Sequence, residues 1–257
     1  MTYGSDPATS GGTTLTAGAA NVKGAWVQLT AATTRDASWI DVNLAAVSAI
    51  GRFVVDIGIG AATEQIIMPD LFATAAEGNV NCCTYSFRLF IPAGSRLVAR
   101  VASTAASATI QIIVKLYSGT TPLGGSGPSL VATYGTITSG VGPLVDPGAV
   151  ANTDSAWVEM TASTVRDHHS LVLAGRFGDS VLAGATRWLV DIGIGAATEQ
   201  ELISDILFSA GITADNPTEM LQHAPVFVAK GSRLTCRLRS NSVTAGDRAA
   251  NLLLYGN

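Results

Sequence analysis

The sequence predicts an all-β protein built from two tandem antiparallel β-sandwich domains of the jelly-roll-like kind. Apolar and polar residues alternate along many short segments, which is typical of strands with one buried face. The same pattern runs through the 257-residue chain twice, as expected when one domain is present in two copies. No long run shows the period of an amphipathic helix, and about eight short strands per copy suit a jelly roll.

The repeat is visible as matched residues at a slowly growing offset. Trp26 aligns with Trp157 at an offset of 131, and eight of the thirteen residues in 24–36 are identical to those in 155–167. The offset reaches 138 at the closing strands. Each increase falls between patterned segments, where loops absorb insertions.

The repeat divides the chain into three parts. The first sandwich is expected at 1–120 and the second at 134–257. Between them, 121–133 is rich in Gly, Pro and Ser, a composition typical of a flexible linker.

Strands of the first copy follow from the alternation. They are expected near 14–16, 24–30, 38–46, 52–60, 64–72, 84–91, 95–103 and 108–117. The alternation directs inward Phe53, Val55, Ile57, Ile59, Leu97, Ala99, Val101, Ile110, Ile112, Val114 and Leu116. Segments 44–50 and 71–77 are rich in alanine, so short helical turns are an alternative there.

Composition and charge argue against several classes of function. Charged residues make up 13% of the chain, about half the usual proportion. The net charge is -4 with scattered basic residues, so we expect no nucleic-acid partner and no anionic membrane partner. We expect neither a Sec signal nor a membrane span. The three cysteines lack metal-site spacing, and no metal or cofactor is expected. The bland surface favours contact with other proteins.

The stretch VDIGIGAATEQ occurs at 55–65 and again at 190–200. A dinucleotide-binding loop needs G-x-G-x-x-G at the start of a helix, whereas Gly58 and Gly60 lie inside a period-two strand and Thr63 takes the third position. The two glycines are expected to leave one strand face bare. A cover supplied by the same domain or a bend at a sandwich corner, a subunit-packing surface, and a shallow ligand surface are the alternatives for this face.

Catalysis is not expected. On a straight strand, Asp56 and Glu64 would lie roughly 26 Å apart, whereas the paired carboxylates of glycosidases lie about 5 to 9.5 Å apart. A hairpin at 60–63 could bring them together, but no further acid or aromatic platform accompanies them. We therefore expect no catalytic residue, and the protein is not expected to be an enzyme.

Charged residues recur at equivalent positions of the two copies. Arg96 and Arg100 alternate with inward-facing residues, so both are expected to point outward. They can pair with carboxylates of a neighbouring strand or of another subunit, and ordinary ion pairs within the chain are the alternative. The candidate assembly surface consists of Asp56, Gly58, Gly60, Arg96 and Arg100 with Asp191, Gly193, Gly195, Arg233 and Arg237.

Some residues occur in one copy alone. His168 and His169 replace Ala37 and Ser38. Adjacent residues of a strand point to opposite faces, so the two histidines are not expected to bind one metal ion together. Cys236 falls at an inward position and is expected to fill the core.

Four motifs recur in both copies. In the first copy they are a Trp-Val-x-Leu-Thr segment followed by Arg-Asp at 26–36, VDIGIGAATEQ at 55–65, GSRL with a following arginine at 94–100, and the closing Leu-Tyr at 116–117. Together they resemble small β-sandwich structural proteins of tailed bacteriophages and gene transfer agents, and the resemblance covers nearly all of both repeats. It implies a virion structural protein, either a capsid decoration or spike protein or a tail-associated one, assembled in the host cytoplasm.

The resemblance also implies partners, namely other virion proteins and further copies of this chain. Two similar domains per chain would let a trimer present six quasi-equivalent sandwiches, which matches a hexameric capsomer or a tail ring. The alternative is a glycan- or host-receptor-binding module on the virion surface, since jelly rolls often serve as lectins.

Overall fold

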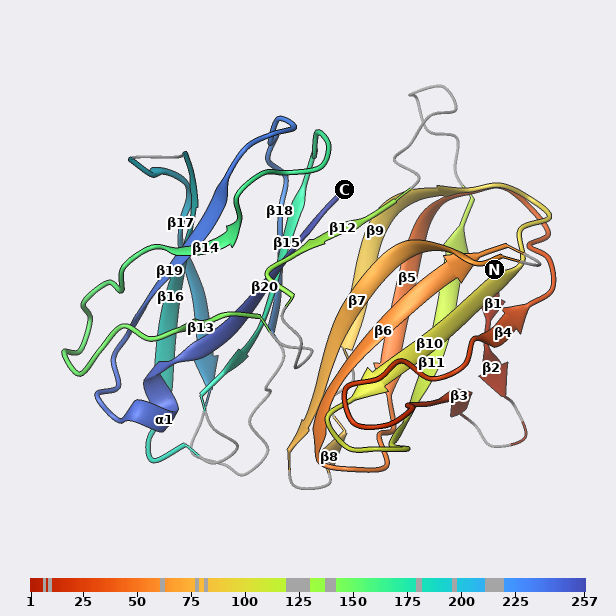
Figure 1. The fold of residues 1–257 in the computed structure, drawn as a ribbon, viewed down its shortest axis with the longest axis horizontal. Coiled ribbons are helices and arrows are strands. Elements are labelled where there is room, and N and C mark those ends of the chain that lie inside the picture. The colour runs from red at the N-terminus through yellow and green to blue at the C-terminus, as the bar shows by residue number, and fades with distance from the viewer. Residues whose placement is uncertain are drawn as a thin grey trace. The chain divides into compact units, whose positions relative to one another are not determined.

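The computed structural model describes residues 1–6, 8, 11–60, 63–76, 79–80, 83–118, 130–136, 142–178, 182–195, 198–210 and 220–257. Two compact units form within them (Figure 1): Met1–Ala132 with Asn257, and Thr133–Gly256. Most of the expected linker, residues 121–129, lies outside the described residues. Both units are antiparallel β-sandwiches, so the predicted fold class is confirmed.

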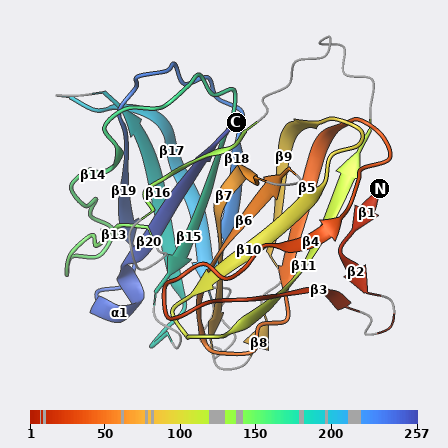
Figure 2. The same cartoon turned by 45° about the vertical axis from the view of Figure 1, so that its right-hand side comes forward.

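The first unit contains two sheets that face each other (Figures 1 and 2). One has the order β2-β3-β11-β5-β9, with β1 also beside β11, and the other has the order β4-β10-β6-β7-β8. The strand bounds are β1 Thr2–Tyr3, β2 Ser5–Asp6, β3 Gly11–Thr16, β4 Val27–Thr30, β5 Ala37–Ala45, β6 Gly51–Ile59, β7 Gln65–Ala76, β8 Asn79–Val80, β9 Cys83–Ile91, β10 Leu97–Ser103 and β11 Thr109–Tyr117.

The second unit repeats this plan. Its sheets have the orders β12-β20-β15-β18, with β13 also beside β20, and β14-β19-β16-β17. The bounds are β12 Ala132–Tyr134, β13 Leu144–Val145, β14 Val158–Thr161, β15 Leu171–Phe177, β16 Thr186–Ile194, β17 Gln200–Ala210, β18 Met220–Ala224, β19 Leu234–Ser240 and β20 Ala250–Gly256, and the short helix α1 spans Ala245–Arg248.

The strand order is that of a jelly roll. When the eight main strands of the first unit (β3, β4, β5, β6, β7, β9, β10 and β11) are numbered one to eight along the chain, the sheets read 1-8-3-6 and 2-7-4-5. Strands β13 to β20 of the second unit give the same two orders. Each sandwich therefore closes the first strand against the last, and the two halves of the chain share one topology.

The core of the first unit lies between its two sheets. The side chains expected to point inward are buried, with Ile59 half-buried at the end of β6. The alanine-rich segments do not form the helical turns offered as an alternative. Residues 71–76 continue β7 because pairing with β6 outweighs the helix propensity of alanine, and β5 ends at Ala45, before a left-handed residue at Ala46 (φ 49°).

His168 is a buried residue that only the second unit has. It takes the place of Ala37, and its side chain is fully buried. Its Nε2 lies 2.6 Å from the hydroxyl of Tyr134, which in turn accepts the N–H of Val165 at 3.1 Å. Burial, together with the nearby Arg166, lowers the pKa of His168 to about 4. The imidazole is therefore neutral at pH 7, and His169 points to the opposite, exposed face as expected.

The buried histidine predicts an acid-sensitive second domain. Below pH 6.5 the His168 side chain is protonated in the unfolded chain but stays neutral in the folded one. The free energy of unfolding therefore decreases as the pH falls toward 4. At about pH 4.5 we expect the second domain to lose about 2 to 3 kcal/mol relative to pH 7 from this group. Urea unfolding monitored by fluorescence, to which the buried Trp188 contributes, measures the loss.

The matched variant is His168→Ala, which restores the residue found at the equivalent position of the first domain. Its overall stability falls because the ring leaves a cavity, but its loss between the two pH values should be smaller than that of the wild type. An unchanged pH dependence in the variant would contradict the assignment to His168.

Candidate functional site

The repeated VDIGIG segment forms an internal strand of each unit. It is β6 in the first unit, between β10 and β7, and β16 in the second, between β19 and β17. Opposite Asp56, β7 contains a β-bulge in which residues 69 and 70 face one residue of β6. The same bulge occurs opposite Asp191, at residues 204 and 205. The segment is therefore part of a sheet whose irregularities were retained in both copies.

A tryptophan of the same domain covers the first glycine of each repeated segment, Gly58 or Gly193. A Cβ atom at Gly58 would lie 3.1 Å from the ring of Trp26 and 3.1 Å from Val98. The guanidinium group of Arg100 lies 4.4 Å above the Trp26 ring centroid, as in a cation–π pair. In the second unit Trp157 lies even closer to Gly193, with Arg237 above it at 4.6 Å.

The expectation of a bare strand face is thus corrected. Glycine at these positions makes room for an indole ring, because any side chain would occupy the space that the ring fills. Of the alternatives for this face, cover by the strand's own domain is the one observed. Gly58 and Gly193 lie beneath that cover, and Asp56 and Asp191 are buried beside them.

Asp56 ties this layer together. Its carboxylate, 3% exposed, accepts hydrogen bonds from Lys23 Nζ at 2.6 Å, Arg100 Nε at 2.8 Å and the backbone N–H of Asp70 at 3.0 Å. Asp70 is the bulge residue and has a left-handed φ of 53°, a conformation that costs a non-glycine residue roughly 1 to 2 kcal/mol. The carboxylate therefore anchors a strained turn as well as two cations.

The second unit keeps the anchor but changes the cations around it. Asp191 accepts the Arg237 Nε and the N–H of Asp205, each at 2.7 Å, and Asp205 is again left-handed (φ 57°). The place of Lys23 is taken by Asp154, and the cation that pairs with Asp205 is Arg239, at the position of Ala102. The cation that pairs with the bulge aspartate is thus Lys23 in the first unit and Arg239 in the second.

Arg96 holds the β6–β7 hairpin. Its Nη1 donates to the carbonyl of Gly60 at 2.8 Å and to Glu64 at 3.0 Å, and its Nε donates to Gln28 at 2.9 Å. The hydrogen bond from Arg96 lowers the pKa of Glu64.

Arg233 makes the equivalent contacts in the second unit, with Gly195, Glu199 and Glu159. The aspartate and the glutamate of each repeated segment therefore pair with different arginines. These are the intrachain ion pairs offered above as one alternative.

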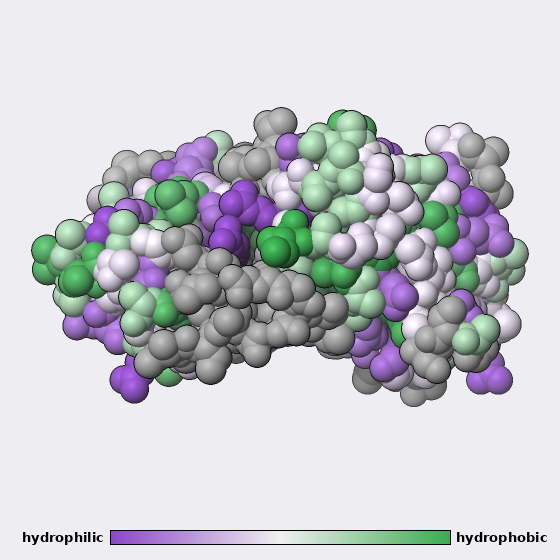
Figure 3. Space-filling view, turned by 90° about the horizontal axis from the view of Figure 1, so that it is seen from below, coloured by the Kyte–Doolittle hydropathy of each residue, from purple (hydrophilic) through white to green (hydrophobic). Residues whose placement is uncertain are grey.

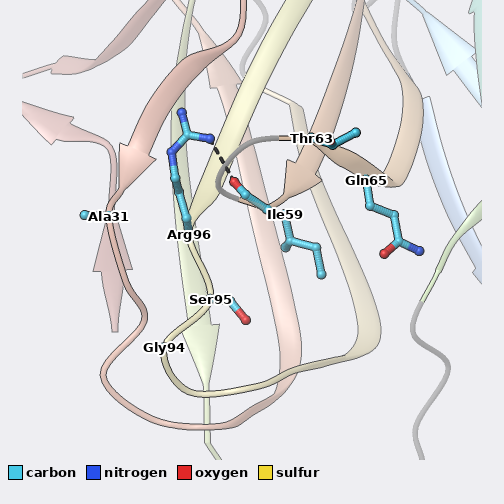
Figure 4. Close-up of a pocket in the computed structure, with 8 residues that line it drawn as sticks. Ala31, Ile59, Thr63, Gln65, Gly94, Ser95 and Arg96 are labelled. Atoms are coloured by element: carbon cyan, nitrogen blue, oxygen red, sulfur yellow. Dashed lines mark hydrogen bonds between the residues drawn. The ribbon is translucent and has the colours of Figure 1, made fainter.

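A shallow pocket of about 400 Å³ lies beside Arg96 (Figure 4). We call its lining the hairpin-end surface, which consists of Ala31, Ile59, Gly60, Thr63, Gln65, Gly94, Ser95 and Arg96. The equivalent residues of the second unit are Ala162, Ile194, Gly195, Thr198, Gln200, Gly231, Ser232 and Arg233, and all eight are identical. The alternation of strand residues alone did not single out Ala31, Thr63, Gln65 or Ser95, although their identity between the copies was a visible signal.

The described residues meet neither the requirements of a metal site nor those of a membrane-spanning helix. Within the described ranges, no group of three or more His, Cys, Asp or Glu side chains is arranged to hold a metal ion. The described residues also contain no helix that could cross a membrane. Burial raises the pKa of the Cys236 thiol, which fills the core as expected. On the face shown in Figure 3, hydrophilic and hydrophobic residues are intermixed.

No protein-family model and no curated protein sequence matches the chain. Among solved structures, the tandem CBM22-1-CBM22-2 domain of Xyn10C from Paenibacillus barcinonensis is 10% identical with a TM-score of 0.29, and the match covers 90% of this chain and 82% of that one. The structure of the infectious bursal disease virus Gx strain is 9% identical with a TM-score of 0.25, covering 86% and 57%.

A third structure, the triple jelly roll of an archaeal virus turret, is 10% identical with a TM-score of 0.22, covering 96% of this chain and 58% of that one. The chain therefore spans less than two thirds of both viral proteins. The structural neighbours include viral proteins and carbohydrate-binding domains, and at these TM-scores we transfer no function from any of them.

Because Asp56 anchors the bulge and two cations, replacing it with alanine is expected to lower the stability of the first domain strongly. Asp56→Ala removes the shared partner of Lys23 and Arg100 and the acceptor for the left-handed Asp70. Because both cations keep some exposure to water, we expect a loss of about 2 to 4 kcal/mol in the free energy of unfolding of the first domain. Urea denaturation measures it.

The control is Ile50→Ala, at a 63% exposed position of the first domain outside the hairpin-end surface, which should change stability by no more than about 0.5 kcal/mol. Equal stabilities for the two variants would show that Asp56 does not anchor the sheet.

Proposed function

We propose that the protein is a structural component of the virion of a tailed phage or phage-like particle, which acts by packing against virion proteins and copies of itself without catalysis. The observation that carries the proposal is the identity of the hairpin-end surface in both domains. The resemblance of the repeated motifs to phage and gene-transfer-agent structural proteins supports it as well.

The fold explains only part of this identity. Gly60 and Gly94 have positive φ angles of 127° and 78°, and Arg96 ties the hairpin together. Ala31, Thr63 and Gln65 are exposed and are nevertheless identical in the second domain. Exposed side chains that only meet water are free to diverge, so a shared contact accounts for their retention.

Neighbouring exposed positions have diverged, which sharpens the contrast. Ala32 corresponds to Ser163, and Ala93 corresponds to Lys230. All four are exposed. Exposed residues adjacent in sequence to the hairpin-end surface thus differ between the two domains, whereas the eight residues that line it are identical.

The chemistry of the surface suits protein packing. Its lining is mostly small, and its cation is already neutralised, since Arg96 pairs with Glu64 inside the domain. Covering such a surface removes little unpaired charge from water, so the desolvation cost is low. The arginine of each hairpin-end surface is engaged in an ion pair within its own domain, Arg96 with Glu64 and Arg233 with Glu199, which supports packing rather than proton transfer.

Two identical surfaces on one chain allow both domains to make the same contact in a symmetric assembly. A trimer would present six of them, one per sandwich, to a hexameric capsomer or a tail ring. Of the residues of the candidate assembly surface, this proposal retains those at the hairpin, namely Gly60, Arg96, Gly195 and Arg233.

The proposal predicts self-association that depends on this surface. Native mass spectrometry of the wild type at micromolar concentration should show an oligomer, with the trimer as the expected species. The double variant Gln65→Arg, Gln200→Arg adds a cation and bulk to both surfaces and should shift the population to monomer. Val243→Arg, at an exposed position outside the surface, adds one arginine away from both surfaces and should leave the oligomer unchanged.

Immunogold labelling of purified particles supplies the second readout and should decorate one class of site. A chain that is only monomeric and is missing from particles would overturn the proposal.

A further inference from the structure

The outer face of one sheet carries two exposed aromatic side chains on adjacent strands. Tyr117 of β11 lies directly opposite Trp39 of β5, and Lys115 lies opposite Asp41 one row further along. Trp39 is 37% exposed and Tyr117 is 47% exposed. Ser86 of β9 lies beside Asp41 on its other side. We call these five residues the aromatic platform.

Asp41 lies beside both rings. Its Oδ1 accepts the indole N–H of Trp39 at 3.0 Å and the hydroxyl proton of Ser86 at 2.6 Å, and its carboxylate raises the pKa of the Tyr117 hydroxyl. Partial burial raises the pKa of Asp41, but the hydrogen bonds from Ser86, Tyr117 and Trp39 and the charge of Lys115 together lower it. One carboxylate therefore holds the indole ring of Trp39 by a hydrogen bond and interacts with the hydroxyl of Tyr117.

Aromatic side chains that are exposed and already ordered are suited to binding. A ligand that contacts them loses little further side-chain freedom, so more of the contact energy appears as affinity. Tryptophan and tyrosine also supply broad, rigid contact area at low entropic cost.

The jelly-roll fold does not require the platform. In the second unit, Val172 lies opposite Tyr255 and Ala174 lies opposite Leu253, in the rows equivalent to Trp39 with Tyr117 and Asp41 with Lys115. The acid and the tryptophan are both missing there. The platform is thus a property of the first domain alone, unlike the hairpin-end surface.

The surroundings of the rings indicate the class of ligand. Arg88 lies opposite Trp39 on β9 and is exposed, as is Lys115. The row beyond Asp41 and Ser86 holds Asn43, which is hydrogen-bonded to Thr84 at 2.9 Å. Lysine, aspartate and serine are depleted in protein interfaces, whereas Lys115, Asp41 and Ser86 surround these rings. A sugar ring needs both kinds of contact, an apolar face for its C–H groups and polar partners for the hydroxyl or carboxylate groups at its edge.

We propose that the aromatic platform binds a saccharide, with the sugar ring against Trp39 and Tyr117 and its polar edge toward Lys115 and Arg88. This inference goes beyond the packing role and does not depend on it, because the platform lies on the other sheet of the first sandwich from β6 and β7.

The test is an array of bacterial polysaccharides, in which neutral chains and chains containing uronic acids form separate arms. The wild type should bind at least one of them, and Trp39→Ala should weaken that binding by roughly tenfold to thirtyfold, as for an anchoring aromatic residue. Tyr117→Phe keeps the ring but removes the hydroxyl that interacts with Asp41, so a smaller loss of a few-fold is expected. Comparison of the two arms identifies whether the cations meet hydroxyl or carboxylate groups.

The matched control is Phe227→Ala, which removes an aromatic residue with 57% exposure from the second domain and should leave binding unchanged. Circular dichroism confirms that each variant is folded. Absence of binding to every polysaccharide, or equal binding by wild type and Trp39→Ala, would overturn the saccharide site. Native mass spectra of the same samples report on assembly separately, so a failure here is distinguishable from a failure of the packing proposal.

Discussion

The structure of each domain depends on one buried carboxylate. Asp56 in the first domain and Asp191 in the second join an internal strand to a bulge in the strand on one side. Each also binds the arginine that lies directly opposite it on the strand on the other side. The arginine in turn covers a tryptophan that lies on glycine. A polar group at this depth is costly unless every oxygen is used. Because it is used fully, the same geometry was retained in two copies that otherwise differ widely.

The two domains separate what a jelly roll requires from what a particular surface does. Strand order, bulges and the tryptophan–arginine layer are common to both and belong to the scaffold. The hairpin-end surface is common to both but partly exposed, which sets it apart from the scaffold. The aromatic platform and buried His168 each occur in one domain. Both proposed binding surfaces therefore contain exposed residues that the jelly-roll fold itself does not require.

Sequence pattern was sufficient to predict the fold class, the repeat and the inward faces of the strands, because burial imposes a period of two that survives in Val55, Ile57 and Leu97. It failed for the glycines of the repeated segment. Alternation shows which face Gly58 belongs to, but it does not reveal that Trp26, more than thirty positions away, fills that face. The platform was missed for a similar reason. Trp39 and Tyr117 are far apart in the chain and become neighbours only through strand pairing.

The difference between Lys23 and Asp154 is coupled to a second difference, between Ala102 of the first domain and Arg239 of the second. In the first domain, an aspartate at position 23 would place three carboxylates around the single cation Arg100, and the network would lose its balance of charge. In the second domain that aspartate is tolerated beside Arg239. Arg239 therefore compensates for the aspartate, and the two positions form a coupled pair. The copies are thus epistatic at these positions: an aspartate suited to one half is not suited to the other unless the arginine is transferred with it.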